Sequence, residues 1–218
     1  MSSSSQKIVY FVRHGQSVDN ASPIYQSVNS PLSAKGKDQA AGIAERLTHI
    51  EFEALVSSPV LRAKETAQCI SDKTHKAIII SDLFKERVRP SETDGKPHAD
   101  EVASKLWREW EESLYTSGLR VSDGENYDDI TARTDKALDF LVNRPETTLA
   151  VVTHGYFLRA VVARVLLGDY QTGDLIRRIH KRTYIENTAI TVLKYMEMPG
   201  LGFVWRLWTF NDHSHFAE

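Results

Sequence analysis

Short apolar runs rich in β-forming residues alternate along this chain with segments of helical periodicity. Four of these runs lie at residues 8–12, 54–57, 78–81 and 149–152, and none has the regular polar–apolar alternation of a half-exposed strand. A strand covered on both faces has such a continuous apolar pattern. Because strands that alternate with helices usually form a parallel sheet with helices on both sides, the pattern predicts an α/β fold.

The segments between the runs indicate where helices begin and which residues they bury. Ser33 is the predicted N-cap of one helix, and Ser58 with Pro59 forms the predicted start of the next. Residues 157–167 are apolar on nearly every side, which indicates a helix buried against the sheet. Two more stripes at helical spacing are interpreted as core; they are Val102, Leu106, Trp110 and Leu114, and Ile130, Thr134, Ala137, Leu138 and Leu141.

Near the end of the chain, residues 188–195 and 203–210 are two further runs of strand-forming residues. Pro199 and Gly200 lie between them, so we expect the two runs to pair as closing strands.

Composition and charge are those of an ordinary globular protein. The 218 residues fit one domain over residues 1–218, with the serine-rich residues 1–6 as a flexible tail. The net charge of −2 provides no positive field for nucleic acid, and no apolar stretch reaches the roughly 18 residues that span a membrane. The single cysteine, Cys69, excludes an internal disulfide framework. We therefore expect a cytoplasmic protein without nucleic-acid or membrane partners; its oligomeric state is left open.

Two of the predicted strands end in the same way, in histidine followed by glycine. The residues concerned are Arg13, His14 and Gly15 after the first strand, and His154 and Gly155 after the strand at 149–152. Ligands of open parallel sheets bind beyond the carboxyl ends of the strands, so we expect both histidines to share one crevice. Glycine directly after each histidine leaves room for a ligand to approach the backbone.

A third strand, at residues 54–57, leads into a helix that carries Arg62 in its first turn. The N–H groups of a helix start and a guanidinium that grips two oxygens together outline a phosphate site. Each feature alone is usually structural, since a histidine at a strand end often makes only a hydrogen bond and a helical arginine is often solvated. Their coincidence favours a phosphate-binding site.

The sequence Val-Arg-His-Gly-Gln-Ser at residues 12–17, followed by Asn20, resembles the signature of the histidine phosphatase superfamily, also called the phosphoglycerate mutase-like family. Further matches run along nearly the whole chain, and they are Pro31, Leu32, Ser33, Gly36, Gln39, Ser57, Ser58, Pro59, Arg62, Thr66, Glu86, Gly124, Glu125, Thr153, His154, Gly155, Asn187, Thr188 and Ala189. An isolated Arg-His-Gly is weak, but this ordered set is specific.

The resemblance implies a fold and a set of roles. The fold is a three-layer α/β/α sandwich around a mixed, mostly parallel sheet of about six strands. Residue by residue, His14 resembles the nucleophile and Glu86 the proton donor. The implied phosphate contacts are Arg13, Arg62 and His154, with Asn20 as an accessory contact and Gly155 beside them.

Physical chemistry gives these roles a reason. His14 must be neutral to attack phosphorus, and a hydrogen bond from its other ring nitrogen to a backbone carbonyl would aim its lone pair. Charge spreads over three phosphoryl oxygens in the transition state, and Arg13, Arg62 and a protonated His154 could meet it. We therefore predict that the enzyme uses no metal and no cofactor.

Glu86 is expected to protonate the leaving alkoxide and then to act as a base toward water. Glu92, Asp94 and Glu125 are weaker candidates for this role, because a solvated loop or a first helical turn commonly carries such side chains. The predicted function is hydrolysis of a small phosphorylated metabolite through a phosphohistidine.

A phosphomutase is the first alternative. Typical glycolytic mutases of this family follow the donor glutamate with Arg-His-Tyr-Gly, whereas here Glu86 is followed by Arg-Val-Arg-Pro-Ser. This departure favours the phosphatase. Residues 87–97 are expected to form an irregular loop over the site, in which Arg87, Arg89 and Lys96 either hold a second anionic group or are simply solvated.

Other functions fit less well. A non-catalytic phosphate-binding module would have no need of both His14 and Glu86. The basic run at residues 177–182 has no interleaved aromatic residues, so a solvated helix face is favoured over a nucleic-acid contact. Cys69 lacks the arginine six positions on that a cysteine-dependent phosphatase requires, since His75 stands there.

Overall fold

The computed structural model describes residues 6–25 and 27–216, which form a six-stranded mixed sheet with helices on both faces. The predicted tail at residues 1–6 lies, apart from Gln6, outside the described residues. The strands in spatial order are β3 (Ile78–Ile80), β2 (Ala54–Ser57), β4 (Thr148–Thr153), β1 (Lys7–Arg13), β5 (Ile190–Met198) and β6 (Gly202–Asp212). The first four are parallel, whereas β5 pairs antiparallel with β1, and β6 antiparallel with β5.

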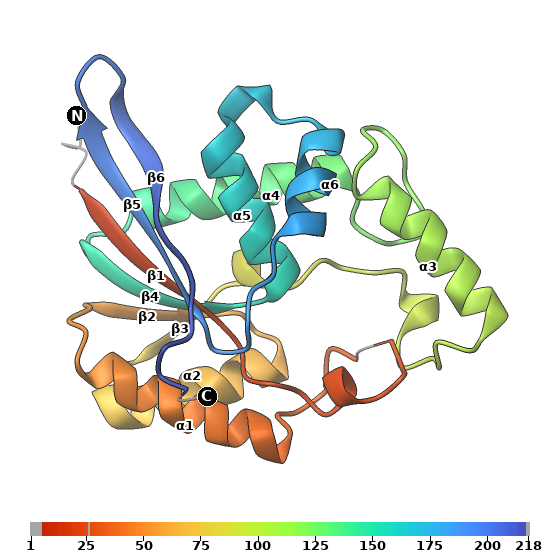
Figure 1. Ribbon diagram of the computed structural model, residues 1–218, viewed down its shortest axis with the longest axis horizontal. Coiled ribbons are helices and arrows are strands. Elements are labelled where there is room, and N and C mark those ends of the chain that lie inside the picture. Colours follow the sequence, from red (N-terminus) through yellow and green to blue (C-terminus); the bar gives the residue numbers. More distant parts are fainter. Residues whose placement is uncertain (1–5, 26, 217–218) are drawn as a thin grey trace.

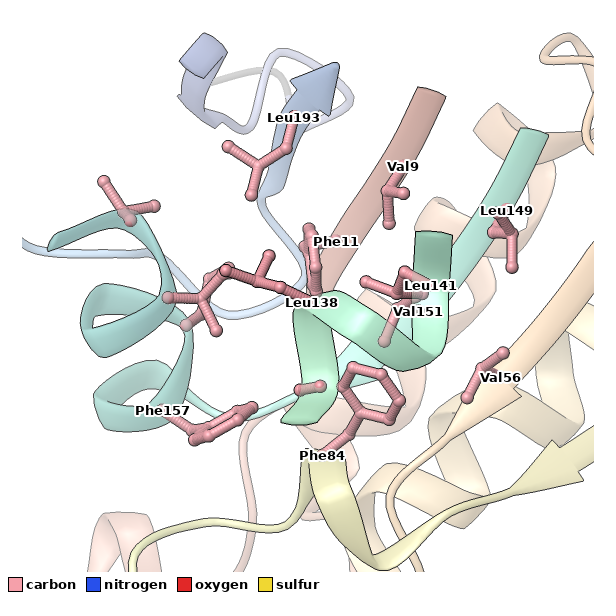
Figure 2. Close-up of a cluster of buried hydrophobic side chains, with 14 of the residues drawn as sticks. Val9, Phe11, Val56, Phe84, Leu138, Leu141, Leu149, Val151, Phe157 and Leu193 are labelled. Atoms are coloured by element: carbon pink, nitrogen blue, oxygen red, sulfur yellow. The ribbon is translucent and has the colours of Figure 1, made fainter. Parts of the chain in front are cut away.

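Helices α1 (Ala34–Thr48) and α2 (Leu61–Thr74) cover one face of the sheet, and α4 (Tyr127–Val142) and α5 (Gly155–Leu167) cover the other (Figure 1). Successive strand residues point to opposite faces, as the pleat requires. Val9 and Phe11 of β1 pack with α4 and α5 (Figure 2), whereas Val12 packs with α1 and α2. The predicted three-layer α/β/α sandwich is confirmed.

Two more helices lie outside these layers. Helix α3 (Glu101–Ser113) lies at the far edge of the molecule in Figure 1, and α6 (Gly173–Arg182) packs against α5. Short 3₁₀ turns occur at Asp19–Ala21, Asp82–Phe84, Ser91–Thr93 and Gly168–Tyr170. The third of them interrupts the loop at residues 87–97, which is otherwise irregular as predicted.

Most sequence-based expectations for the elements are confirmed. Ser33 caps α1 by accepting a hydrogen bond from the backbone N–H of Gly36 at 3.0 Å. All five residues of the second stripe, from Ile130 to Leu141, are buried in α4. The two closing strands pair as expected, across a turn that contains Gly200 in the left-handed region.

Three expectations are wrong. The run at residues 78–81 is predicted as a buried strand, but β3 lies at the edge of the sheet, where Ile80 is 49% exposed. Helix α2 begins at Leu61 rather than at Pro59, and Val60 is its N-cap without a side-chain hydrogen bond. The Ser58 hydroxyl lies instead 2.8 Å from Nε2 of His154, so a tertiary contact replaces the predicted cap. Val102 is 80% exposed, because the buried side of α3 is formed by Ala103 and Trp110, and Val102 lies away from it.

The segment that follows β1 is fixed against the start of α1. The backbone N–H of Gln16 donates to the Gln39 side chain at 2.8 Å, and the backbone N–H of Ser33 donates to the Gln16 carbonyl at 2.9 Å. Gly36 permits this contact, because a Cβ there would lie 1.9 Å from the Gln16 carbonyl oxygen. The helix therefore holds the backbone that follows His14.

We predict that Gly36→Ala destabilises the fold by at least about 2 kcal/mol, since an added methyl group would push backbone against backbone. The matched control is Gly42→Ala in the same helix, where the new Cβ makes only ordinary contacts, at 3.4 Å and beyond. An alanine there is expected to be neutral or to stabilise by up to about 1 kcal/mol. Urea unfolding measures both variants, and equal stabilities would contradict the role of Gly36.

Candidate active site

The two histidines lie side by side at the carboxyl ends of two neighbouring parallel strands. Arg13 of β1 is in register with Thr153 of β4, so the next residue of each chain segment, His14 and His154, enters the same crevice. Their ring centroids are 5.0 Å apart, and both side chains are buried. The prediction of a shared crevice is confirmed.

The His14 ring has a defined orientation and tautomer. Its Nδ1 lies 2.6 Å from the carbonyl oxygen of Gly15, which can only accept, so Nδ1 carries the proton. Nε2 therefore has the lone pair, and it accepts a hydrogen bond from Nε of Arg62 at 3.1 Å. Burial, together with the charges of Arg62 and Arg13, holds the pKa of His14 well below its usual value. The expected neutral imidazole with a carbonyl partner is present.

Two arginines bring positive charge to this histidine pair. Arg62 comes from the first turn of α2 and is buried; burial lowers its pKa to about 10, so it remains a cation at neutral pH. Arg13 donates to the Ile185 carbonyl oxygen, while its own Nε is buried without a partner. Gly155 lies against this side chain, since a Cβ there would be 3.2 Å from Nε of Arg13. Because Gly155 has no side chain, the Arg13 side chain can lie close to its backbone.

His154 differs from the expectation of a protonated imidazole. Its Nε2 contacts the Ser58 hydroxyl at 2.8 Å, whereas Nδ1 is buried without a hydrogen-bond partner. Burial and the charges of Arg62, Arg133 and Arg13 lower the pKa of His154 well below its usual value. In this structure His154 is therefore neutral, because the pocket already holds several cations.

Glu86 lies at the N-terminus of α5, beside the histidine pair. Its carboxylate accepts hydrogen bonds from the backbone N–H groups of Phe157 at 3.1 Å, Tyr156 at 3.3 Å and Arg87 at 3.1 Å. Burial alone would raise the pKa of Glu86, but the charges of Arg87 and Arg62 and these N–H donors outweigh it and lower the pKa. Glu86 is therefore ionised at neutral pH.

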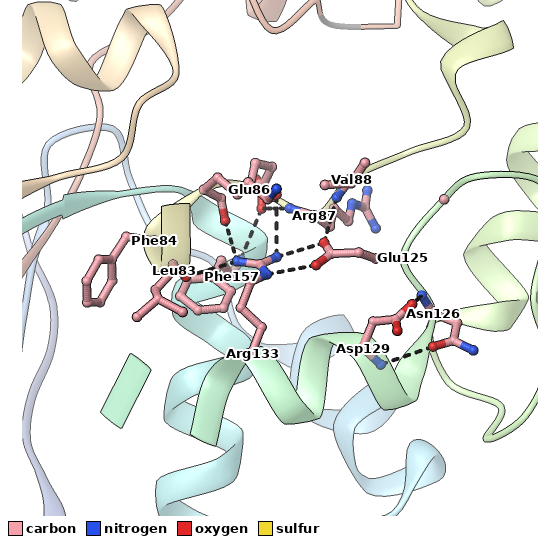
Figure 3. Close-up of polar contacts among 12 residues, drawn as sticks. Leu83, Phe84, Glu86, Arg87, Val88, Glu125, Asn126, Asp129, Arg133 and Phe157 are labelled. Atoms are coloured by element: carbon pink, nitrogen blue, oxygen red, sulfur yellow. Dashed lines mark hydrogen bonds and ion pairs between the residues drawn. The ribbon is translucent and has the colours of Figure 1, made fainter. Parts of the chain in front are cut away.

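The segment that carries Glu86 is held by a buried ion pair that the sequence analysis did not identify (Figure 3). Arg133 of α4 forms a bidentate pair with Glu125, with both N–O distances at 2.8 Å, and donates to the carbonyl oxygens of Leu83 and Lys85. The Glu125 carboxylate also accepts from the backbone N–H of Val88 at 2.8 Å. The Glu125 carboxylate is thus engaged with Arg133 and with the backbone N–H two residues after Glu86. These contacts argue against Glu125 as a proton donor.

The remaining predicted site residue, Asn20, lies at an exposed position in the 3₁₀ turn after β1. Its side-chain oxygen accepts from the Ser17 hydroxyl at 3.0 Å. Asn20, Arg62 and Glu86 line one cavity of about 750 Å³, whereas His14 lies next to this cavity, behind Arg62. The structure thus gathers every predicted site residue around one end of the sheet.

Two negative findings concern the part of the chain that the structure describes. Residues 6–25 and 27–216 contain no group of three or more His, Cys, Asp or Glu side chains arranged to hold a metal ion. No helix in these residues is both long and apolar enough to cross a membrane.

The chain is similar to known proteins over nearly its whole length. It is 29% identical over 211 residues to the probable phosphoglycerate mutase GpmB of Enterobacter sp. (strain 638), covering 95% of this chain and 94% of that protein. Its fold matches a mycobacterial glucosyl-3-phosphoglycerate phosphatase with a TM-score of 0.73, 23% identity and coverage of 95% and 100%. It also matches the α-ribazole phosphatase of Shigella flexneri, with a TM-score of 0.78, 17% identity and coverage of 94% and 96%.

The family model of the histidine phosphatase superfamily (branch 1) matches residues 9–208, a range that includes His14, Arg62, Glu86 and His154. The paired histidines at the ends of β1 and β4 therefore lie in a domain of a known type, and the chain belongs to the histidine phosphatase superfamily.

Proposed function

We propose that the chain is a metal-independent phosphomonoester hydrolase, which transfers the phosphoryl group of a small phosphorylated metabolite to Nε2 of His14 and then to water. The observation that carries the proposal is the His14 tautomer. Since Nδ1–H is bound to the Gly15 carbonyl, the lone pair is on Nε2, among the cations of the pocket. A neutral, oriented imidazole is the form that can attack phosphorus.

The first step forms the Nε2–P bond and breaks the P–O bond to the substrate alcohol. Before this attack, Arg62 must turn its Nε–H from Nε2 of His14 to a phosphoryl oxygen, which frees the lone pair. Arg13 and Arg62 stabilise the charge on the equatorial oxygens. A bound phosphate dianion also offsets the arginine charges that lower the pKa of His154 and so raises the affinity of this side chain for a proton, but the proposed steps use only the proton that enters with the substrate.

The leaving alkoxide needs a proton, and Glu86 is the group proposed to deliver it. Glu86 is ionised in this structure, so the proton enters with the monoanion of the phosphomonoester. The proton can pass from the bound substrate to Glu86 without exchange with solvent, because a substrate monoanion with ionised Glu86 and a dianion with protonated Glu86 hold the same number of protons. In the second step Glu86 takes a proton from water, the oxygen attacks phosphorus, and the N–P bond breaks to leave neutral His14. The proton on Glu86 then departs with the phosphate as its monoanion, which restores ionised Glu86.

A phosphomutase is the second candidate, because the relative described above is a probable phosphoglycerate mutase. A mutase must also hold the carboxylate of phosphoglycerate. Arg87, a cation near Glu86, packs over the rings of Trp107, Trp110 and Tyr156 at 4.4–5.3 Å and lies 3.7 Å from Glu111. These contacts hold the Arg87 guanidinium against the cavity wall instead of leaving it free to bind a substrate carboxylate. They therefore support hydrolysis over mutase activity.

We expect His14→Ala to reduce hydrolysis at least about 10³-fold, because it removes the nucleophile. Brief reaction of the original protein with a radiolabelled phosphomonoester in the presence of EDTA, followed by an alkaline quench, should trap an acid-labile phosphoprotein labelled at His14. His49→Ala, at an exposed position, is the matched control. Activity above one part in a thousand in His14→Ala, or loss of activity in EDTA, would contradict the mechanism.

Glu86→Gln tests the proton donor through the basicity of the leaving group. Alkyl esters need a proton on the departing alkoxide, so formation of the phosphoenzyme should slow by roughly 10²–10⁴-fold. With nitrophenyl phosphate, whose phenolate leaves readily, the rate of phosphoenzyme formation in the same single-turnover step should fall clearly less. Glu92→Gln, an exposed change in the neighbouring loop, should leave both rates unchanged. Equal losses for both ester classes would assign Glu86 to phosphate positioning alone.

The expected pH profile of kcat/KM follows from the lowered pKa values of His14 and Glu86. His14 has a lowered pKa, so it stays neutral as the pH falls through 6.5, and we expect no loss of kcat/KM between about pH 6.5 and 5. Because the proton enters with the substrate monoanion, kcat/KM for alkyl esters should fall about tenfold per pH unit above the second phosphate pKa of about 6. Steady-state assays at constant ionic strength measure this profile. A loss of activity centred near pH 6.5 on the acidic side would indicate that His14 titrates normally.

A further inference from the structure

The cavity beside the histidine pair is much larger than a phosphoryl group requires. Its volume is about 750 Å³, in the range of pockets that enclose drug-sized molecules. Only Asn20, Arg62 and Glu86 of the proposed reaction centre lie in its wall. Most of the rest of the wall comes from residues 22, 24, 25 and 28, from the loop at residues 85–98 and from α3, and Asp19, Val60 and Asp123 complete it. This outer part is available to the alcohol portion of a substrate.

Charges in the outer wall balance one another. Its three cations are Lys85, Arg87 and Arg89, and its three carboxylates are Asp19, Asp94 and Asp123. A guanidinium nitrogen of Arg89 lies 3.6 Å from a carboxylate oxygen of Asp94. A guanidinium nitrogen of Arg87 lies 3.7 Å from a carboxylate oxygen of Glu111, which is just outside the wall. A second anionic group on a substrate would find no net positive charge here and would meet three carboxylates. The outer wall therefore favours an uncharged group.

Aromatic and apolar side chains supply the other contacts. The rings of Tyr25 and Trp107 are stacked with centroids 4.5 Å apart, and His98 meets the Tyr25 ring edge-on at 4.6 Å. Trp110 packs against Trp107 at 5.0 Å. The aliphatic wall residues are Ile24, Val28, Val60 and Val88, of which Val28 is 53% exposed. Such a wall stabilises flat apolar groups through burial and ring contacts.

We propose that the alcohol portion of the small phosphorylated metabolite is uncharged and carries an aromatic ring, and that this ring binds against Tyr25, His98 and Trp107. The inference rests on the proposed hydrolysis at His14 and specifies its substrate class. Compact anionic esters such as 3-phosphoglycerate fill little of the cavity and bring a carboxylate to a wall without net charge. The aromatic ester gains its binding energy from surface that the compact ester leaves in contact with water.

The test is a series of three alkyl esters that differ only at the end remote from phosphorus. Propyl, 3-phenylpropyl and 3-carboxypropyl phosphate have leaving alkoxides of similar basicity, so their differences in kcat/KM report binding of the terminal group. We expect the phenyl ester to exceed the propyl ester at least tenfold, and the carboxyl ester not to exceed it. A carboxyl ester equal to or better than the phenyl ester, or no gain from the ring, would overturn the proposal.

Variants locate the ring. Trp107→Ala should reduce the ratio of kcat/KM for 3-phenylpropyl phosphate to that for propyl phosphate at least fivefold, and it should change kcat/KM for propyl phosphate by no more than about twofold. Trp107→Phe should retain most of the preference for the phenyl ester. Trp208→Ala, on β6 and 57% exposed, is the matched control. An unchanged phenyl advantage in Trp107→Ala would overturn the assigned ring position, and the three-ester series decides the substrate class even if this variant does not fold.

Nitrophenyl phosphate separates the two levels of the proposal. If His14-dependent hydrolysis of this ester occurs while the alkyl series shows no preference for the ring, only the substrate class is wrong. If none of the esters is hydrolysed and no phosphohistidine forms, the proposed function fails, and the substrate class fails with it.

Discussion

The parallel pairing of β1 with β4 is the constraint on which the site depends. These two strands lie at the centre of the sheet, and their register aligns Arg13 with Thr153, so the residues that follow them leave the sheet at the same edge. Both strands are buried on both faces, in the two cores beneath the helices. A shift of one residue would turn their core side chains to the wrong faces. The 5.0 Å separation of the two imidazole rings is therefore fixed by the same packing that stabilises the fold.

Burial of charge is the second constraint. Arg62 is held at 2% exposure next to two histidines, and the pocket limits the repulsion by keeping both imidazoles neutral and by placing ionised Glu86 nearby. Glu86 in turn depends on backbone that Arg133 and Glu125 hold from the other side. A buried pair of this kind adds little net stability compared with apolar residues, but removing one partner leaves an unpaired buried charge. Its position suggests that its main effect is on the geometry of the Glu86 segment.

The sequence predicted the fold class, the core strands and the meeting of His14 with His154, because these follow from local periodicity and from one rule about parallel sheets. The family resemblance added the roles of Glu86 and Asn20, which no spacing argument could supply. What escaped prediction depends on distant contacts. Ser58 contacts His154, 96 residues away, instead of capping α2. The pairing of Arg133 with the Leu83–Lys85 backbone spans about 50 residues, and its only local signal is an arginine within the buried stripe of α4.

The protonation states of the site follow from burial and from the net charge in the pocket rather than from any single residue. Burial lowers the pKa values of His14 and His154 and would raise that of Glu86, whereas the arginine charges push all three downward, so all three groups are deprotonated at neutral pH. A phosphate dianion opposes the field of the arginines at each of these groups, but its effect on each group differs with the contacts of that group. His14 keeps its tautomer through the Gly15 carbonyl, whereas Nδ1 of His154 has no partner and Glu86 has only N–H donors around it. Binding of the phosphate should therefore raise the proton affinity of the acid and of the phosphate-binding histidine, while the Gly15 carbonyl keeps the proton of neutral His14 on Nδ1 and its lone pair on Nε2, where the bond to phosphorus forms.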